Sequence, residues 1–336
     1  MSLPRAQVLL VELLAAAAAV FVVIHSHLVP ALLGGLLAFV ISVDVQAAAR
    51  RRQHRWPRWV TLSLAGLAAV ATIALLIGAL LAAFRKADIA GLSVSVIKGI
   101  EAFHALLPAW LADYIPGGAG GVREALATFL RSQSEAIRGA GLGMLHGMVH
   151  ALLGAVVGVM LSFESGLPAH PIGRRIATMA QELVRAFRGV LVAQAKISAV
   201  NALLTGVFLL GVMPLLGLAL PLSKTLVALT FIVGLVPVLG NLLSNTAITL
   251  VALLVSPAAA VAALVFLVLV HKLEYFLNAR IVGGEVGARA WELLLAMLVA
   301  EAAFGVAGLI VAPVFYVWLR DLLAGAGDNS ALPAAS

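Results

Sequence analysis

The chain has 336 residues, of which 63% are hydrophobic and only 11% are charged. Soluble domains are about 45–50% apolar, so this composition excludes an ordinary soluble protein. It predicts a membrane protein that is embedded in the lipid bilayer. The net charge of +7 lies mostly in two short arginine clusters between apolar segments. We therefore expect the charge to set orientation in a membrane, and we expect no nucleic-acid partner.

Apolar segments long enough to cross a hydrocarbon core of about 30 Å follow one another along the chain. They predict an all-α, polytopic membrane protein with about seven to eight transmembrane or re-entrant helices. The first is expected to be a retained membrane helix rather than a signal peptide, because Glu12 interrupts its apolar part. The expected spans are 8–24, 28–47, 59–83, 143–163, 194–216, 224–254, 257–276 and 291–319.

The arginine clusters predict which ends of the spans face the cytoplasm. "RRRQHRWPRW" begins at Arg50 and follows the second span, whereas Arg174, Arg175, Arg185 and Arg188 follow the fourth. Basic loops stay cytoplasmic under the positive-inside rule, and an even number of crossings separates the two clusters. Both clusters therefore predict a cytoplasmic N-terminus.

Composition and periodicity divide the chain into segments. Between the third and fourth spans, apolar residues recur at helical spacing in two runs that "IPGGAGG" separates, which predicts an extramembrane helical hairpin. After the fourth span, the pattern predicts an amphipathic helix at the inner face. The segments are 1–83, N-terminal transmembrane helices; 84–142, the hairpin insert; 143–193, a transmembrane helix and a cytoplasmic amphipathic helix; 194–324, a C-terminal transmembrane domain with broken or re-entrant helices; and 325–336, a disordered tail.

The fourth span carries small residues on one stripe. Gly143, Gly147, Gly154 and Gly158 lie at multiples of about one helical turn, with Ala151 between them. Small residues at this spacing let helix backbones approach closely in a membrane, where lipid provides no hydrophobic drive for association. We expect tight helix packing at this stripe, within one chain or between chains.

Residues 224–254 are too long for one straight span. As a helix they would measure about 46 Å, half again the thickness of the core. Pro237 removes a backbone donor in the middle of the segment, and Gly240 tolerates irregular dihedral angles. The chain should break there, with Asn241 and Asn245 as partners for the freed backbone groups.

Two paths through this break remain open, a bent crossing helix or a re-entrant hairpin. Eight full crossings would put Lys272, Arg280 and Arg289 outside, against the positive-inside tendency. A hairpin explains both the excess length and these charges, so the sequence favours it slightly.

The last apolar segment is interrupted in the same way. Gly305, Gly308 and Pro313 lie within it, and Glu301 precedes the first glycine by one turn. A carboxylate near the bilayer centre costs about 2.5–3.5 kcal/mol on insertion scales, so it must face a partner or water. Two interrupted segments in the C-terminal half are typical of a transport site built from discontinuous helices.

Enzyme and metal motifs are absent from the sequence. There is no H-E-x-x-H, no G-x-S-x-G and no G-x-x-x-x-G-K. His146 and His150 are one turn apart, but no carboxylate or third histidine lies near enough in sequence to complete a metal site. We expect no enzyme activity, no cofactor and no metal.

Three stretches of the C-terminal half match motifs of one known family: Pro237-Val-Leu-Gly240 matches a P-x-x-G break, "LEYFLNARIVGG" matches an L-x-P-x-I-x-G stretch at Leu277, Ile281 and Gly283 that Glu274 precedes, and "FGVAGLIVAP" matches a closing F-G-x-x-G-x-x-x-x-P. By these motifs the chain resembles the autoinducer-2 exporter family of bacterial inner-membrane permeases. Gln194 is a weaker match to a G-Q pair. Ala279 replaces a usual proline, which indicates a divergent member. The resemblance implies a bacterial inner-membrane protein and a homo-oligomer, with a pentamer as the suggested size.

Three functions follow from the resemblance and the breaks. The first is a secondary exporter of a small polar solute, with autoinducer-2 as the substrate of one family member. The second is a sodium or lithium/proton antiporter, with the proton on Glu301, Glu274 or Asp44. The third is a membrane scaffold that transports nothing. The candidate path residues are Pro237, Gly240, Asn241, Asn245, Glu274, Asn278, Gly305 and Gly308.

Overall fold

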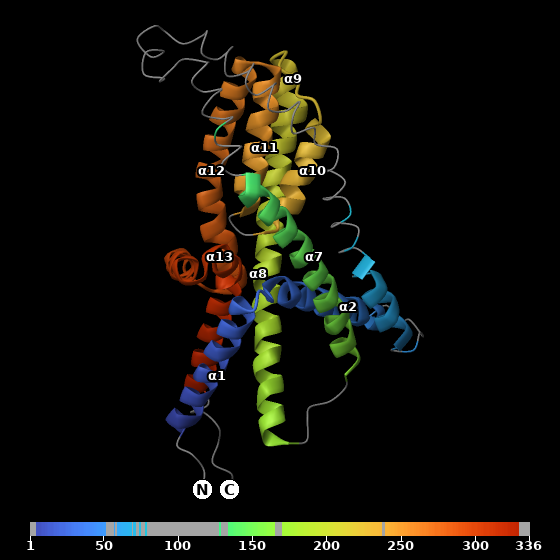
Figure 1. The fold of residues 1–336 in the computed structure, drawn as a ribbon, viewed down its shortest axis with the longest axis vertical. Coiled ribbons are helices and arrows are strands. Elements are labelled where there is room, and N and C mark those ends of the chain that lie inside the picture. The colour runs from blue at the N-terminus through green and yellow to red at the C-terminus, as the bar shows by residue number, and fades with distance from the viewer. Residues whose placement is uncertain are drawn as a thin grey trace. The chain divides into compact units, whose positions relative to one another are not determined.

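The computed structural model describes residues 5–51, 57, 59–68, 70, 71, 74, 78, 128, 134–164, 170–236 and 239–328. The regular secondary structure of these residues is helical, as Figure 1 shows, which confirms the all-α prediction. Most of the predicted insert at 84–142 and of the predicted tail at 325–336 lies outside the described residues.

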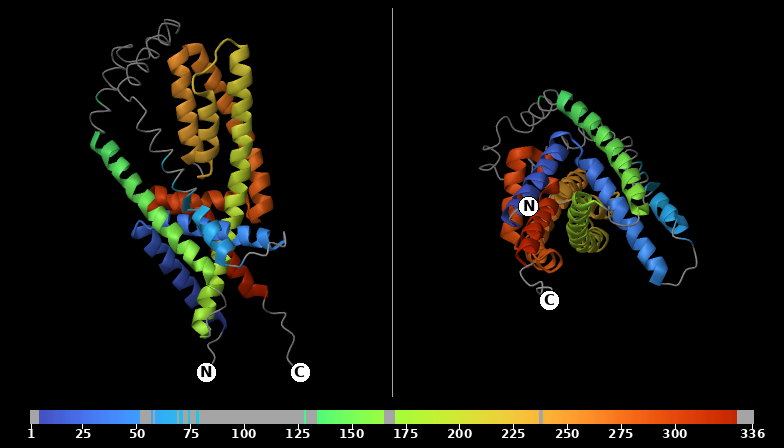
Figure 2. Two further views of the ribbon diagram at one scale, coloured as in Figure 1. Left: turned by 90° about the vertical axis from the view of Figure 1, so that its right-hand side faces the viewer. Right: turned by 90° about the horizontal axis from the view of Figure 1, so that it is seen from below.

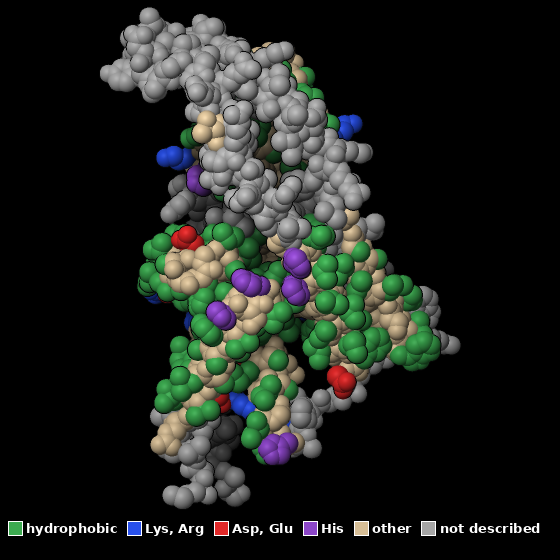
Figure 3. Space-filling view, in the orientation of Figure 1, with side chains coloured by type: hydrophobic (Ala, Val, Ile, Leu, Met, Phe, Trp, Pro, Cys, Tyr) green, Lys and Arg blue, Asp and Glu red, His purple; other side chains and the backbone are tan. Residues whose placement is uncertain are grey.

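Four of the described helices contain a stretch that is long and apolar enough to cross a membrane: Val29–Arg51, Leu145–Phe163, Pro171–Leu215 and Ala290–Ala324. Shorter apolar helices accompany them, among them Trp59–Ala68. Apolar side chains cover much of the described surface (Figure 3), and Leu215 is 89% exposed. A surface so rich in exposed apolar side chains is suited to contact with lipid rather than with water. Together with the long apolar helices, it indicates a multi-pass membrane protein.

Contacts divide the chain into two compact units. Unit 1 consists of Met1–Leu80, Gly143–Leu191 and Glu285–Ser336, and unit 2 consists of Leu81–Leu142 and Val192–Gly284. Each unit is therefore assembled from segments that are far apart in the sequence.

In unit 1, α2 (Val29–Arg51) crosses α7 (Ser134–Phe163) at very close range (Figure 2). A Cβ atom on Gly35 would lie 2.9 Å from the carbonyl oxygen of Gly154, and one on Gly158 would overlap the carbonyl of Gly35. Gly154 meets Ala31 in the same way. The small residues of α7 therefore pack against α2 of the same chain, where any larger side chain would separate the two backbones.

Ion pairs connect the first half of α8 (Pro171–Val207) to two other helices of unit 1. Arg175 pairs through two nitrogens with Glu12, a buried residue of α1 (Arg5–His25). Arg188 lies 3.0 Å from Asp44 of α2. The amphipathic helix predicted after the fourth span thus packs into unit 1 through these ion pairs.

The structure does not end a helix at the boundary predicted near residue 193. α8 continues to Val207, then through a π-helical turn, Phe208–Val212, into α9 (Met213–Leu215). The sequence after Pro171 contains no further proline before Pro214, so the change from basic to apolar residues alone does not interrupt the backbone. One long helix replaces the two predicted ones.

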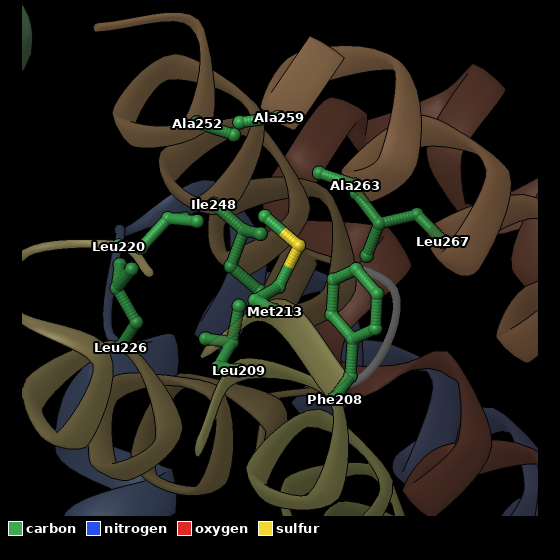
Figure 4. Close-up of a cluster of buried hydrophobic side chains, with 10 residues drawn as sticks. All are labelled: Phe208, Leu209, Met213, Leu220, Leu226, Ile248, Ala252, Ala259, Ala263 and Leu267. Carbon is green, nitrogen blue, oxygen red and sulfur yellow. The ribbon is translucent and has the colours of Figure 1, made fainter. Parts of the chain in front are cut away.

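Unit 2 packs α10 (Ser223–Gly234), α11 (Leu239–Val255) and the apolar part of α12 (Pro257–Val286) around the end of α8. Its core brings together side chains from the π-helical turn after α8, from α9 and from α10, α11 and α12 (Figure 4). The ring of Phe208 stacks on that of Phe266 with centroids 4.0 Å apart. The buried residues of this cluster are Phe208, Leu209, Met213, Leu220, Leu226, Ile248, Ala252, Ala259, Ala263 and Leu267.

The break predicted within 224–254 is present, and the chain turns back at it. α10 ends at Gly234, α11 begins at Leu239, and the two helices lie side by side. A Cβ on Gly240 would overlap the carbonyl of Val233, so glycine is required where the chain folds back. α10 would measure about 18 Å, too short to cross the core alone, and the hairpin is the path that the structure takes.

The last helix, α13 (Ala290–Asp328), is broken at Gly305. The backbone there has φ 63° and ψ −149°, a region that essentially only glycine occupies. The hydroxyl of Tyr316 donates a 2.9 Å hydrogen bond to Glu292, so the two halves of α13 fold toward each other. Pro313 was predicted to interrupt the segment as well, but helical backbone continues through it.

The close crossing of α2 and α7 predicts that replacing glycine by alanine changes the stability of the protein differently at two positions of α7. Gly154→Ala should destabilise the protein by about 1–3 kcal/mol, because the new methyl group overlaps the backbone of α2. Gly143→Ala should be neutral or stabilising by up to about 1 kcal/mol, since nothing lies within 4 Å of its Cβ position and alanine favours helix. Thermal unfolding of the two variants in detergent checks this, and equal melting temperatures would contradict it.

Candidate functional site

The candidate site lies in unit 2, where a polar face of α8 meets the break between α10 and α11. Gln194 donates a 2.6 Å hydrogen bond through Nε2 to the carbonyl oxygen of Gly234. The hydroxyl of Ser198 donates to the carbonyl oxygen of Phe231 at 2.5 Å. Carbonyls in the last turn of a helix lack intrahelical partners, so these side chains replace the hydrogen bonds that the break removes.

One helical turn further along α8, Asn201 faces the start of α11. Its Nδ2 donates to Oδ1 of Asn241 at 3.4 Å. Asn201 is 4% exposed and Asn241 is half-buried, so the amide pair lies at the edge of the buried part of the unit. We call Gln194, Ser198, Asn201 and Asn241 the polar seam.

Buried hydroxyl groups extend the polar seam along both helices. Thr205 on α8 and Ser244 on α11 are both buried, and so is Thr230 near the end of α10. Ser244 donates to the carbonyl of Asn241, and Thr230 donates to the carbonyl of Leu226, so both hydroxyls use backbone acceptors of their own helix. Such bonds leave the hydroxyl oxygens able to accept from a solute.

Sequence reasoning placed Gly240 and Asn241 at the site but missed Ser198 and Asn201. The missed signal was periodic: Gln194, Ser198, Asn201 and Thr205 are separated by four, three and four residues, the spacing of one helix face. A polar face inside an otherwise apolar span indicates a helix whose partner also carries polar groups.

The other predicted path residues lie elsewhere or outside the described part. Asn245 lines a groove between α11 and α12 whose lining includes no member of the polar seam. Gly305 and Gly308 belong to unit 1, at the fold of α13. Pro237 is outside the described residues, and for Glu274 and Asn278 the structure describes the backbone in α12 but not the side chains.

The two other acids predicted as ion-coupling groups have different surroundings. Asp44 is engaged with Arg188 on the surface of unit 1. Glu301 is exposed on the first half of α13. Among the described residues, no group of three histidine, aspartate or glutamate side chains is arranged to hold a metal ion.

The hydrogen bond from Gln194 predicts a loss of stability on its removal. Gln194→Leu leaves the carbonyl of Gly234 without its side-chain partner, which should cost about 1–3 kcal/mol. Gln181→Leu on the same helix is the matched control, because Gln181 is exposed and its loss should change stability by at most about 0.5 kcal/mol. Thermal unfolding in detergent compares them, and a Gln194 variant as stable as the control would show that the carbonyl needs no partner.

One family model matches the chain, the AI-2E family transporter, over residues 10–325. The comparisons with curated proteins and with solved structures gave no match.

Proposed function

The chain belongs to the AI-2E transporter family, and on that premise we propose that it exports a small polar solute through unit 2. The observation that carries this proposal is the polar seam beside the break of α10 and α11. Backbone can leave helical geometry at membrane depth only where protein groups or a water-filled cavity satisfy it. In transporters such breaks are the places where solutes bind.

The members of the polar seam have separable roles. Gln194 and Ser198 form short hydrogen bonds with backbone carbonyls, so they hold the hairpin in place. The bond between Asn201 and Asn241 is 3.4 Å long, beyond the usual range for N–H···O contacts, so exchanging it for a bond to a solute costs little. An amide both donates and accepts, which suits hydroxyl and carbonyl groups of an uncharged polar solute.

The glycines at the two helix breaks are the proposed hinges of the transporter. Gly240 permits the close return of α11 on α10, and Gly305 permits the fold of α13. Small changes of dihedral angle at such positions change the direction of a whole helix, which is how hinges open and close a path. Glu274 and Asn278 remain further candidates for the path.

The membrane, orientation and assembly belong to the same proposal. Arg50 and Arg51 end α2, and a cytoplasmic location for them puts the N-terminus in the cytoplasm of a bacterial cell, in its inner membrane. A homo-oligomer, with a pentamer as the suggested size, is supported by an apolar groove lined by Ala199 and Gly206, because such small residues allow another helix to approach.

Flux through reconstituted vesicles tests the exporter. Wild-type protein should move labelled autoinducer-2 or a member of a panel of small sugars and polyols across the membrane. Asn201→Ala and Asn241→Ala should each reduce the flux about tenfold, the effect of one lost hydrogen bond of about 1.4 kcal/mol in the rate-limiting state. Gln181→Ala, outside the polar seam, should transport at the wild-type rate.

The pair of asparagines also predicts how the two substitutions combine. If both amides bind one solute, the double variant should be little worse than either single variant, because the second change removes an interaction already lost. Wild-type flux in both single variants would contradict the proposed path. A sodium-driven proton flux that Glu301→Gln abolishes, without any solute flux, would instead assign antiport.

A further inference from the structure

A groove of about 470 Å³ lies between α11 and α12, and none of its lining residues belongs to the polar seam. One face of α11 contributes Asn245, Thr246 and Thr249, and α12 contributes His271 and Lys272. The other lining residues are apolar. The groove therefore combines a small set of polar and basic groups with long apolar walls.

The basic groups lie at one end of the groove. Leu242, near the start of α11, and Lys272, far along α12, line the same groove although only Ser256 separates the two helices, so α12 runs back along α11. At about 1.5 Å per residue, Lys272 is then level with the start of α11 and about 8 Å beyond Asn245, a distance that a lysine side chain can largely span. Leu250 and Leu264 lie nearer to Ser256, beside Thr249, so this end is mostly apolar.

The basic end coincides with a change in the sequence of α12. Apolar residues run from Pro257 to Val270, and His271, Lys272 and Glu274 follow in the same helix, which continues to Val286. A lysine at the end of such a segment extends its ammonium group to the headgroup level. Val268 and Leu264 are 57% and 49% exposed, so the apolar walls open toward the surroundings of the helix.

We propose that this groove binds an anionic phospholipid, with the phosphate on Lys272 and Asn245 and an acyl chain along the apolar walls. Basic pockets between membrane helices recognise acidic headgroups by this combination of charge and depth. A small hydrophilic anion would leave the apolar walls uncovered. A zwitterionic lipid would find no carboxylate for its amine among the lining residues that the structure describes.

Lipid-dependent thermal stability of the purified full-length chain in detergent tests the site. Phosphatidylglycerol should raise the melting temperature, whereas phosphatidylcholine with the same acyl chains, or inorganic phosphate alone, should not. Lys272→Gln should increase the phosphatidylglycerol concentration for half-maximal effect about tenfold, as expected on losing one charge-assisted hydrogen bond. Lys224→Gln is the matched control. Lys224 is exposed at the start of α10, so its substitution removes the same charge outside the groove.

A second variant separates the lipid chain from the headgroup. Val268→Trp fills the apolar wall without changing charge and should weaken the response to phosphatidylglycerol as well. The proposal is overturned if Lys272→Gln responds like wild type, if Lys224→Gln weakens the response equally, or if phosphate alone reproduces the stabilisation. It is also overturned if Val268→Trp changes the oligomer size in size-exclusion chromatography and leaves the lipid response intact, because the groove would then be an interface between copies.

Discussion

Carbonyl groups freed by a helix break inside an apolar unit must find donors within the protein, and unit 2 is arranged around this requirement. Gly234 and Phe231 end α10 with carbonyls that Gln194 and Ser198 satisfy from α8. An unpaired buried carbonyl costs about 1–3 kcal/mol, so the hairpin depends on having this face of α8 beside it. The same arrangement brings Asn201 to Asn241 and creates polar surface where the core is otherwise apolar.

Close approach of backbones is the second constraint, and it acts in both units. In unit 1, glycines of α2 and α7 remove the side chains that would separate the helices. In unit 2, Gly240 lets α11 return against α10. Lipid surrounds such helices with an environment as apolar as their own side chains, so association depends on contact area and hydrogen bonds, and small residues increase both.

Charged groups in unit 1 also act in pairs. Glu12 was noticed in the sequence only because it interrupts an apolar stretch, yet it is buried against Arg175 of α8. A buried charge needs a partner of opposite sign, and this pair connects α1 to a helix far away in the sequence. The basic first half of α8 is consequently a packed element as well as a charged one, with Arg188 on Asp44 as its second connection.

Three properties could be predicted from the amino-acid sequence: the all-helical membrane class, the family resemblance, and the breaks near Gly240 and at Gly305. These follow from local properties: apolar length, helix-breaking residues and small-residue spacing act within a few turns of the chain. Packing between the helices places Ser198 and Asn201 against the break and Asn245 in the groove between α11 and α12. Those outcomes depend on how each helix is rotated against its neighbours, which is set by packing between segments distant in sequence.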